Sequence, residues 1–380
     1  MRRERPSKQF ATRVISEAAI ASVGTAFLLC AVLANQRWLD GHFLPSWFLP
    51  HGWWVLIESS VRVMLAAVGV SLALWVRPRL GRLIAATPAR VVQSAIAAVL
   101  ALVAGELVLR HVPPRPVGWL VPEEEPRRRR DPRLGWTVVP GRTGHSTVGG
   151  RVIDYSFDPA GYRVRRDDEP VDPERPTILF IGESVMFGEG LTWEESVPAQ
   201  VGVMMGTQSA NLAVHGFSSD QAYLRLETEL PRFRRPVAVV SLFMTALLGR
   251  NLDDNRPHLG PGLIWLPPEQ HGRLASLVKL LVPYRKADTV DRGVMMTREV
   301  LGATVMLARA RGAMPLIVVP QFGAESQAER ALRRRILDEA GLPYVWIEFD
   351  EGWRLSGNLH PNPGAAHAIA TAVAARLQGR

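Results

Sequence analysis

Residues 178–190 read ILFIGESVMFGEG, an apolar run that stops abruptly at Gly182-Glu183-Ser184. Glycine and serine are common in turns, so one interpretation is a strand that simply ends in a turn. The other is a nucleophilic serine at the carboxyl end of a strand, where a strand-to-helix turn exposes its Oγ. The rest of the chain decides between these two interpretations.

Apolar runs of the same kind recur through residues 177–380 and alternate with segments of helical periodicity. Continuous Val, Ile and Leu runs are typical of parallel strands that are buried on both faces. The pattern predicts an α/β fold, a three-layer sandwich around a parallel five-stranded sheet of the flavodoxin-like type. Ligands bind such sheets beyond the carboxyl ends of the strands, and the sequence places Ser184 at that edge.

Three long apolar runs precede this domain, at about residues 14–35, 53–76 and 91–109. Each is long enough, or nearly so, to cross a bilayer as a helix. Tryptophans cluster near the ends of these runs, as interfacial anchors do. The alternative is a set of buried helices in a soluble protein. Three such runs so close together favour a membrane domain over residues 1–111.

The arginines of this membrane domain are unevenly distributed among its loops. The N-terminal segment and the 77–90 loop are arginine-rich, whereas the 36–52 loop holds only Arg37. The positive-inside rule therefore places the N-terminus and the 77–90 loop in the cytoplasm. Three crossings then predict a multi-pass protein of the inner (plasma) membrane whose C-terminal domain is periplasmic or otherwise extracytoplasmic.

The excess positive charge lies in the first third of the chain. Residues 1–130 hold 17 Lys and Arg against 8 Asp and Glu, whereas residues 131–380 hold 28 of each. The C-terminal domain lacks the overall basic bias of nucleic-acid-binding proteins, so no nucleic-acid partner is expected.

Between the two domains, residues 112–133 are rich in proline and charge and predict a linker. Residues 134–176 contain short β-prone pieces and predict a strand-rich lead-in.

Residue types that serve serine chemistry follow the predicted strand ends. Ser184 can attack and can also offer its own N–H to an oxyanion. Gly216 lets a backbone N–H approach closely, and Asn251 could add a side-chain amide. His360 lies just before the last predicted helix and is the candidate general base. The loop of Asn251 is rich in Asp and Arg and is equally consistent with a solvated salt-bridged loop, and Asn255 is a rival for its role.

These segments resemble the SGNH (GDSL-like) hydrolase superfamily over about residues 176–378. GESxxxGxG stands where the family has its GDS block, NLAVHGFSSDQ stands at the glycine block, and NLHPNPGAAH stands at the C-terminal histidine block. The resemblance implies an ester hydrolase or O-acyltransferase with Ser184 as nucleophile and His360 as base. It implies an acyl-ester substrate, with acetyl the expected group, and no cofactor.

The chain departs from the family pattern near the histidine. The family usually places an Asp three residues before it, where this chain has Gly357, and a variant places it two before, at Asn358. An Asn can orient the imidazole but cannot stabilise its cation as a carboxylate does. Asn358 and Asp350, with Glu351 beside the latter, are the candidates for the third group, and a backbone carbonyl in its place is the other alternative.

Two classes of function follow. The first is a membrane-anchored serine esterase or O-acyltransferase acting on an envelope or exported polysaccharide or a glycolipid. The second is a catalytically degenerate domain that binds carbohydrate or forms part of an envelope assembly, and the missing Asp favours it.

The histidines show no metal-ligand spacing, so no metal site is expected. The family's oxyanion Asn falls near Thr245, several residues before Asn251.

Overall fold

The computed structural model describes residues 8–45, 51–111, 128–269, 272, 274–275 and 284–379. It divides into a helical unit, formed mainly by residues up to 113, and an α/β unit, formed mainly by residues 114–270 and 285–380. Most of the linker predicted at 112–133 lies outside the described residues. The arginine run at its end forms β1 (Arg128–Asp131), which pairs with β2 (Gly135–Val138) in an antiparallel hairpin.

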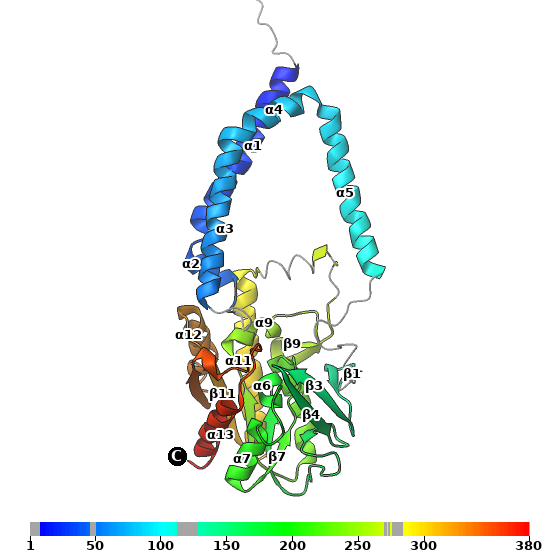
Figure 1. Ribbon diagram of the computed structural model, residues 1–380, viewed down its shortest axis with the longest axis vertical. Coiled ribbons are helices and arrows are strands. Elements are labelled where there is room, and N and C mark those ends of the chain that lie inside the picture. The colour runs from blue at the N-terminus through cyan, green and yellow to red at the C-terminus, as the bar shows by residue number, and fades with distance from the viewer. Residues whose placement is uncertain are drawn as a thin grey trace, which may run out of the picture. The chain divides into compact units, whose positions relative to one another are not determined.

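The helical unit contains three stretches that are long and apolar enough to cross a membrane: Gln9–Leu33, Trp53–Ala86 and Pro88–His111. Each overlaps one of the three apolar runs of the sequence, and the second continues to Ala86, past the expected end at 76. The unit consists of α1 (Lys8–Leu33), α2 (Gln36–His42), α3 (His51–Ser71), a π-helical turn (Leu72–Val76), α4 (Arg77–Ala86) and α5 (Pro88–His111) (Figure 1).

Two features of the helical unit follow from single residue types. A Cβ on Gly24 of α1 would lie 2.8 Å from the Gly69 carbonyl oxygen of α3, so only glycine lets these helices pack this closely. The segment 77–90, expected to be a loop, is helical except at Thr87, because α4 runs to Ala86 and α5 begins at Pro88. The helix ends there because a residue before proline avoids the helical conformation, and Thr87 (φ −135°, ψ 57°) precedes Pro88.

The α/β unit is built on one eight-stranded sheet in the order β12-β11-β8-β6-β7-β5-β4-β3. Its strands are β3 (Thr143–Val148), β4 (Arg151–Phe157), β5 (Arg163–Val164), β6 (Pro176–Ile181), β7 (Gln208–Asn211), β8 (Arg235–Leu242), β11 (Met314–Phe322) and β12 (Tyr344–Phe349). The five strands from β12 to β7 are parallel, which confirms the predicted five-stranded parallel sheet. The lead-in strands β5, β4 and β3 extend it antiparallel.

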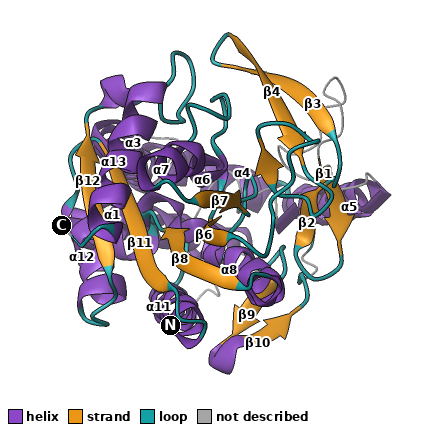
Figure 2. Cartoon of the chain, turned by 90° about the horizontal axis from the view of Figure 1, so that it is seen from below, coloured by secondary structure: helices purple, strands orange, loops and turns teal. Residues whose placement is uncertain are grey.

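Side chains that alternate along the strands bury both faces of the sheet, as expected for extended chains. On β6, Ile178 and Phe180 pack into the core under α7 and α13, whereas Leu179 and Ile181 pack against α8. Further along the sheet, α11 covers the same face as α8. Figure 2 shows these helices on the two sides of the sheet, which confirms the three-layer sandwich.

The helices of the α/β unit mostly begin at polar caps, and several short elements follow the parallel strands. The helices are α6 (Ser184–Phe187), α7 (Val197–Met205), α8 (Ser219–Glu229), α9 (Leu248–Asn251), α11 (Ala287–Ala310), α12 (Gln327–Arg333) and α13 (Pro363–Leu377). Short 3₁₀ turns at Leu230–Arg232, Thr245–Leu247, Pro261–Leu263 and Glu351–Trp353, a π-helical turn at Arg334–Asp338 and a hairpin of β9 (His258–Gly260) with β10 (Ile264–Leu266) complete the unit. The turns that follow β6, β7, β8 and β12 carry the candidate site residues.

Candidate active site

Ser184 lies where the central strand β6 passes into the one-turn helix α6. Gly182 and Glu183 separate the strand from the helix, and the Glu183 side chain caps it by accepting a hydrogen bond from Val185 N at 3.0 Å. Ser184 is buried. Its N–H is the first of the helix, so it has no partner within the helix. The turn thus presents both a hydroxyl and a backbone donor at the carboxyl end of the sheet.

His360 reaches this hydroxyl from the loop between β12 and α13. Its Nε2 lies 2.8 Å from Ser184 Oγ, and its Nδ1 lies 2.6 Å from Asn358 Oδ1. An amide oxygen can only accept, so Nδ1 carries the proton and Nε2 is the acceptor that faces the serine. Burial lowers the pKa of His360 below its usual value, and this favours the neutral ring. The arrangement can take a proton from Ser184.

Asn358 rather than Asp350 is the residue placed to orient the ring. Asn358 Oδ1 also accepts from the backbone N–H of His360 at 2.9 Å, so one amide oxygen fixes both the loop and the imidazole. Asp350 is exposed and caps the turn Glu351–Trp353 through Gly352 N. Glu351 pairs with Arg354 at 2.5 Å. The carboxylates at the end of β12 therefore serve the local turn, and neither forms a hydrogen bond with His360.

A carboxylate that the sequence analysis did not consider as a site residue lies on the other side of the serine. Glu183 Oε2 lies 2.5 Å from Ser184 Oγ and 3.0 Å from Nη1 of Arg250 on α9. Burial acts to raise the pKa of the Glu183 carboxyl, but Arg250, the serine hydroxyl and His360 outweigh it and hold that pKa below its usual value. The only signal in the sequence is the direct adjacency of Glu183 to Ser184.

Gly216 lies in the turn between β7 and α8 with φ +81°, a conformation that glycine adopts without strain. In the part of the chain that the structure describes, its N–H has no hydrogen-bond acceptor, so it can serve an oxyanion. Thr245, at the end of β8, is buried and its hydroxyl has no partner among the same residues. Two backbone donors, those of Ser184 and Gly216, are thus available at this edge of the sheet.

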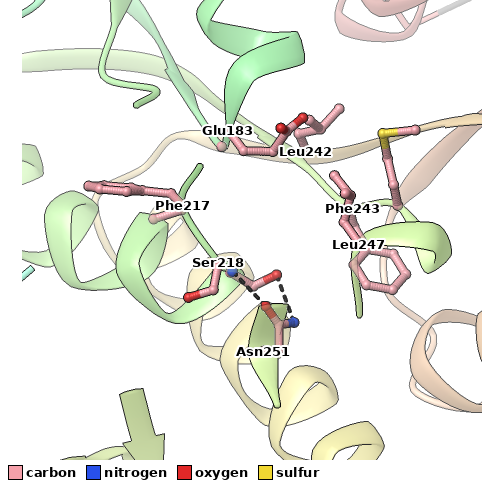
Figure 3. Close-up of a pocket in the computed structure, with 11 residues that line it drawn as sticks. Glu183, Phe217, Ser218, Leu242, Phe243, Leu247 and Asn251 are labelled. Carbon is pink, nitrogen blue, oxygen red and sulfur yellow. Dashed lines mark hydrogen bonds between the residues drawn. The ribbon is translucent and has the colours of Figure 1, made fainter. Parts of the chain in front are cut away.

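Asn251 is committed elsewhere. Its Oδ1 accepts from Ser219 N at 2.9 Å, and its two amide hydrogens go to Ser219 Oγ at 3.2 Å and Thr297 Oγ1 at 2.9 Å. Figure 3 shows Asn251 near Ser218, in a pocket that Glu183 also lines, with two of these hydrogen bonds dashed. No amide hydrogen of Asn251 remains for an oxyanion, and the rival Asn255 is exposed and bonds to Asp253.

The pocket of Figure 3 adjoins the serine turn and has a mixed lining of polar and apolar side chains. Its walls come from the ends of β6 and β8 and from the start of α8, and its apolar lining side chains are Phe217, Ala222, Leu242, Phe243, Met244 and Leu247.

A second histidine, His215, lies near His360. The centroids of the two rings are 5.9 Å apart, and His215 Nδ1 is 3.2 Å from Glu189 Oε2. Among the described residues there is no group of three metal-ligating side chains.

Comparisons with known proteins give structural neighbours only. No family model and no curated protein sequence matches the chain. Among solved structures it is similar to a GDSL-like lipase from Bacteroides thetaiotaomicron (14% identity, 55% of this chain and 91% of that one, TM-score 0.33). It is also similar to an acetyl xylan esterase from Butyrivibrio proteoclasticus (12% identity, 56% of this chain and 66% of that one, TM-score 0.34).

Proposed function

We propose that this chain is a membrane-associated serine esterase or O-acyltransferase that acts on acyl esters through Ser184 and His360. The observation that carries the proposal is the continuous hydrogen-bonded chain from Ser184 Oγ through His360 to Asn358 Oδ1, with contacts of 2.8 and 2.6 Å. Serine, histidine and an orienting polar group in this order are the parts that nucleophilic acyl transfer requires.

The reaction has two steps. Ser184 Oγ attacks the ester carbonyl carbon while His360 Nε2 takes the hydroxyl proton, and the N–H groups of Ser184 and Gly216 bind the developing oxyanion. His360 then gives that proton to the departing alcohol, which leaves an acyl-serine. In the second step His360 deprotonates water or an acceptor hydroxyl, which attacks the acyl carbon and releases Ser184 with its proton restored.

The substrate class and location follow from less direct arguments. The resemblance at the three sequence blocks favours an acyl ester of a carbohydrate or lipid, with acetyl as the expected group. The arginine-poor 36–52 loop favours an extracytoplasmic α/β unit. On this arrangement a polysaccharide or glycolipid of the envelope is the substrate. Protease added to cells whose outer envelope has been opened, with the inner membrane intact, should then cleave the α/β unit. Protection that is lost only when the inner membrane is lysed would place this unit in the cytoplasm.

The test uses the full chain in detergent with p-nitrophenyl acetate and a fluorophosphonate probe. Ser184→Ala should lose both turnover and labelling, and His360→Ala should lower turnover by about 10²- to 10⁴-fold because the general base is missing. Ser356→Ala is the matched control, since Ser356 is exposed on the loop that carries His360. Turnover retained in Ser184→Ala would overturn the proposal. A folded protein that neither turns over nor labels would favour a carbohydrate-binding or scaffolding role.

A further inference from the structure

We propose that Glu183 supplies the negative charge that serine–histidine sites usually take from a carboxylate behind the histidine, and that it acts from the serine side of the ring. This inference rests on the proposed function and identifies a further catalytic residue, because Glu183 touches the reacting hydroxyl itself. It also explains how a site with only an amide behind the histidine can stabilise an imidazolium.

The distances place Glu183 one hydroxyl away from the histidine. Its Oε2 is 2.5 Å from Ser184 Oγ, and that oxygen is 2.8 Å from His360 Nε2. Glu183 is buried, with 6% of its surface exposed. On the opposite edge of the ring, Asn358 offers a neutral oxygen. Glu183 therefore places a carboxylate in direct contact with the serine–histidine pair.

The carboxylate is fixed in place and kept ionised. Oε2 accepts from Arg250 at 3.0 Å, and Oε1 accepts from Val185 N at 3.0 Å, so both oxygens are held. The guanidinium makes the carboxylate a poor proton acceptor, because protonating it would leave Arg250 without its counter-charge. Glu183 therefore acts as a fixed charge, and His360 remains the base.

The proton transfer shows where this charge acts. The serine hydroxyl holds one proton, and its two neighbours Glu183 and His360 compete for it in the resting site. When Oγ attacks the carbonyl carbon, that proton passes to Nε2, and the ring becomes a cation that keeps its Nδ1–H on Asn358. A buried negative charge beside the new cation stabilises it without reorganisation of the site.

Four charged or titratable groups face His360 from the neighbouring elements: Glu183, Glu189, His215 and Arg250. Burial has the largest effect on the pKa of His360 and lowers it. Glu183 opposes this most strongly, followed by Glu189, whereas His215 and Arg250 lower the pKa further. Removal of the charge of Glu183 should therefore move the pKa of His360 downward. If Glu183 served only to cap α6, the same removal should leave the pKa of His360 unchanged.

The test compares four forms of the full chain in detergent: wild type, Glu183→Gln, Asn358→Asp and the double variant. Glutamine keeps an oxygen to cap Val185 N and removes only the charge. Glu183→Gln should lower kcat/KM for p-nitrophenyl acetate by about 10- to 100-fold and move the acid-side midpoint of its pH profile downward. Asn358→Asp places a carboxylate on Nδ1. It should raise that midpoint and raise activity more in the Glu183→Gln background than in wild type.

Several outcomes decide the proposal. An unmoved midpoint in Glu183→Gln, or equal effects of Asn358→Asp in both backgrounds, would overturn the role of Glu183. If Glu183→Gln fails to fold, Glu183→Ala is measured instead: it also removes the charge and should move the midpoint downward, and an unmoved midpoint there overturns the role. Glu194→Gln, in an exposed ion pair with Arg165, is the control and should match wild type. Fluorophosphonate labelling of wild type separates this inference from the proposed function. If wild type is not labelled, the proposed function is overturned. If wild type is labelled but the midpoint of Glu183→Gln does not move, only this inference is overturned.

Discussion

The parallel and antiparallel halves of the sheet contribute different things to the candidate site. The parallel strands β6, β7 and β8 end at turns that present hydroxyl, amide and charged groups to one edge. The antiparallel strands β5 and β4 offer no reacting group there and instead hold the chain that follows α6. Side chains from these two strands bond to carbonyls and an amide of residues 187–191. One half provides the chemistry, and the other keeps it in position.

Arg163 on β5 is the central element of this support. It is almost completely buried, its Nη1 donates to Phe187 O at 2.6 Å and Gly188 O at 2.8 Å, and its Nη2 donates to Leu191 O at 2.6 Å. Its guanidinium also lies 4.5 Å from the centre of the Tyr155 ring, and the Tyr155 hydroxyl accepts from Gly190 N. Charged donors to buried carbonyls are among the stronger hydrogen bonds in proteins, so the loop after the serine is held tightly.

The largest expected effect on stability is therefore that of Arg163→Met, which keeps the length of the side chain and removes its donors. Three carbonyls would lose a charged donor. Phe187 O would keep a bond from Asn211 Nδ2 at 3.2 Å and Gly188 O one from Leu191 N at 3.1 Å, so we expect the α/β unit to lose about 3 kcal/mol of folding free energy. Hydrogen exchange of residues 184–191 measures the loss locally, and thermal unfolding measures it for the unit.

The matched control is Arg165→Met, two residues along the chain. Arg165 pairs with Glu194, and both side chains are mostly exposed, at 63% and 60%. Such pairs contribute little to stability, so this variant should unfold and exchange like wild type. Equal effects of the two substitutions would show that the antiparallel half does not brace the serine turn.

The sequence predicted the parallel half far better than the antiparallel half. Continuous apolar runs report burial on both faces, so the five parallel strands and the turn of Ser184 could be anticipated. The strand β5 has two residues and no periodicity, and a buried arginine that bonds to carbonyls leaves no pattern in the sequence. The same limit hid the pairing of Glu183 with Arg250, because the partners lie 67 positions apart.

A second prediction concerns the pH dependence of the parallel half. Burial lowers the pKa of His360 below its usual value of 6.5, although Glu183 and Glu189 oppose the shift. The base must be neutral to accept the serine proton, so kcat/KM should fall with decreasing pH only at a midpoint below 6.5. The profile of p-nitrophenyl acetate turnover from about pH 4.5 to 8 measures it. Tryptophan fluorescence over the same range checks that the protein stays folded, and a midpoint above the usual histidine value would contradict the expected burial of the ring.

The smallest expected effect on activity is that of Asn251→Ala, which tests whether every polar residue at the carboxyl edge serves the chemistry. Asn251 joins α9 to Ser219 and to the fully buried Thr297. Its loss should cost about 1–2 kcal/mol of stability but change kcat by less than about threefold, because the side chain has no donor left for an oxyanion. Loss of a true oxyanion donor typically costs about 10²- to 10³-fold in kcat. Thermal unfolding and kcat, measured beside the exposed Asn255→Ala variant, separate the two roles. A large drop in kcat at unchanged stability would show instead that Asn251 donates to the oxyanion. The polar residues at the carboxyl edge would then serve the chemistry without exception among those tested.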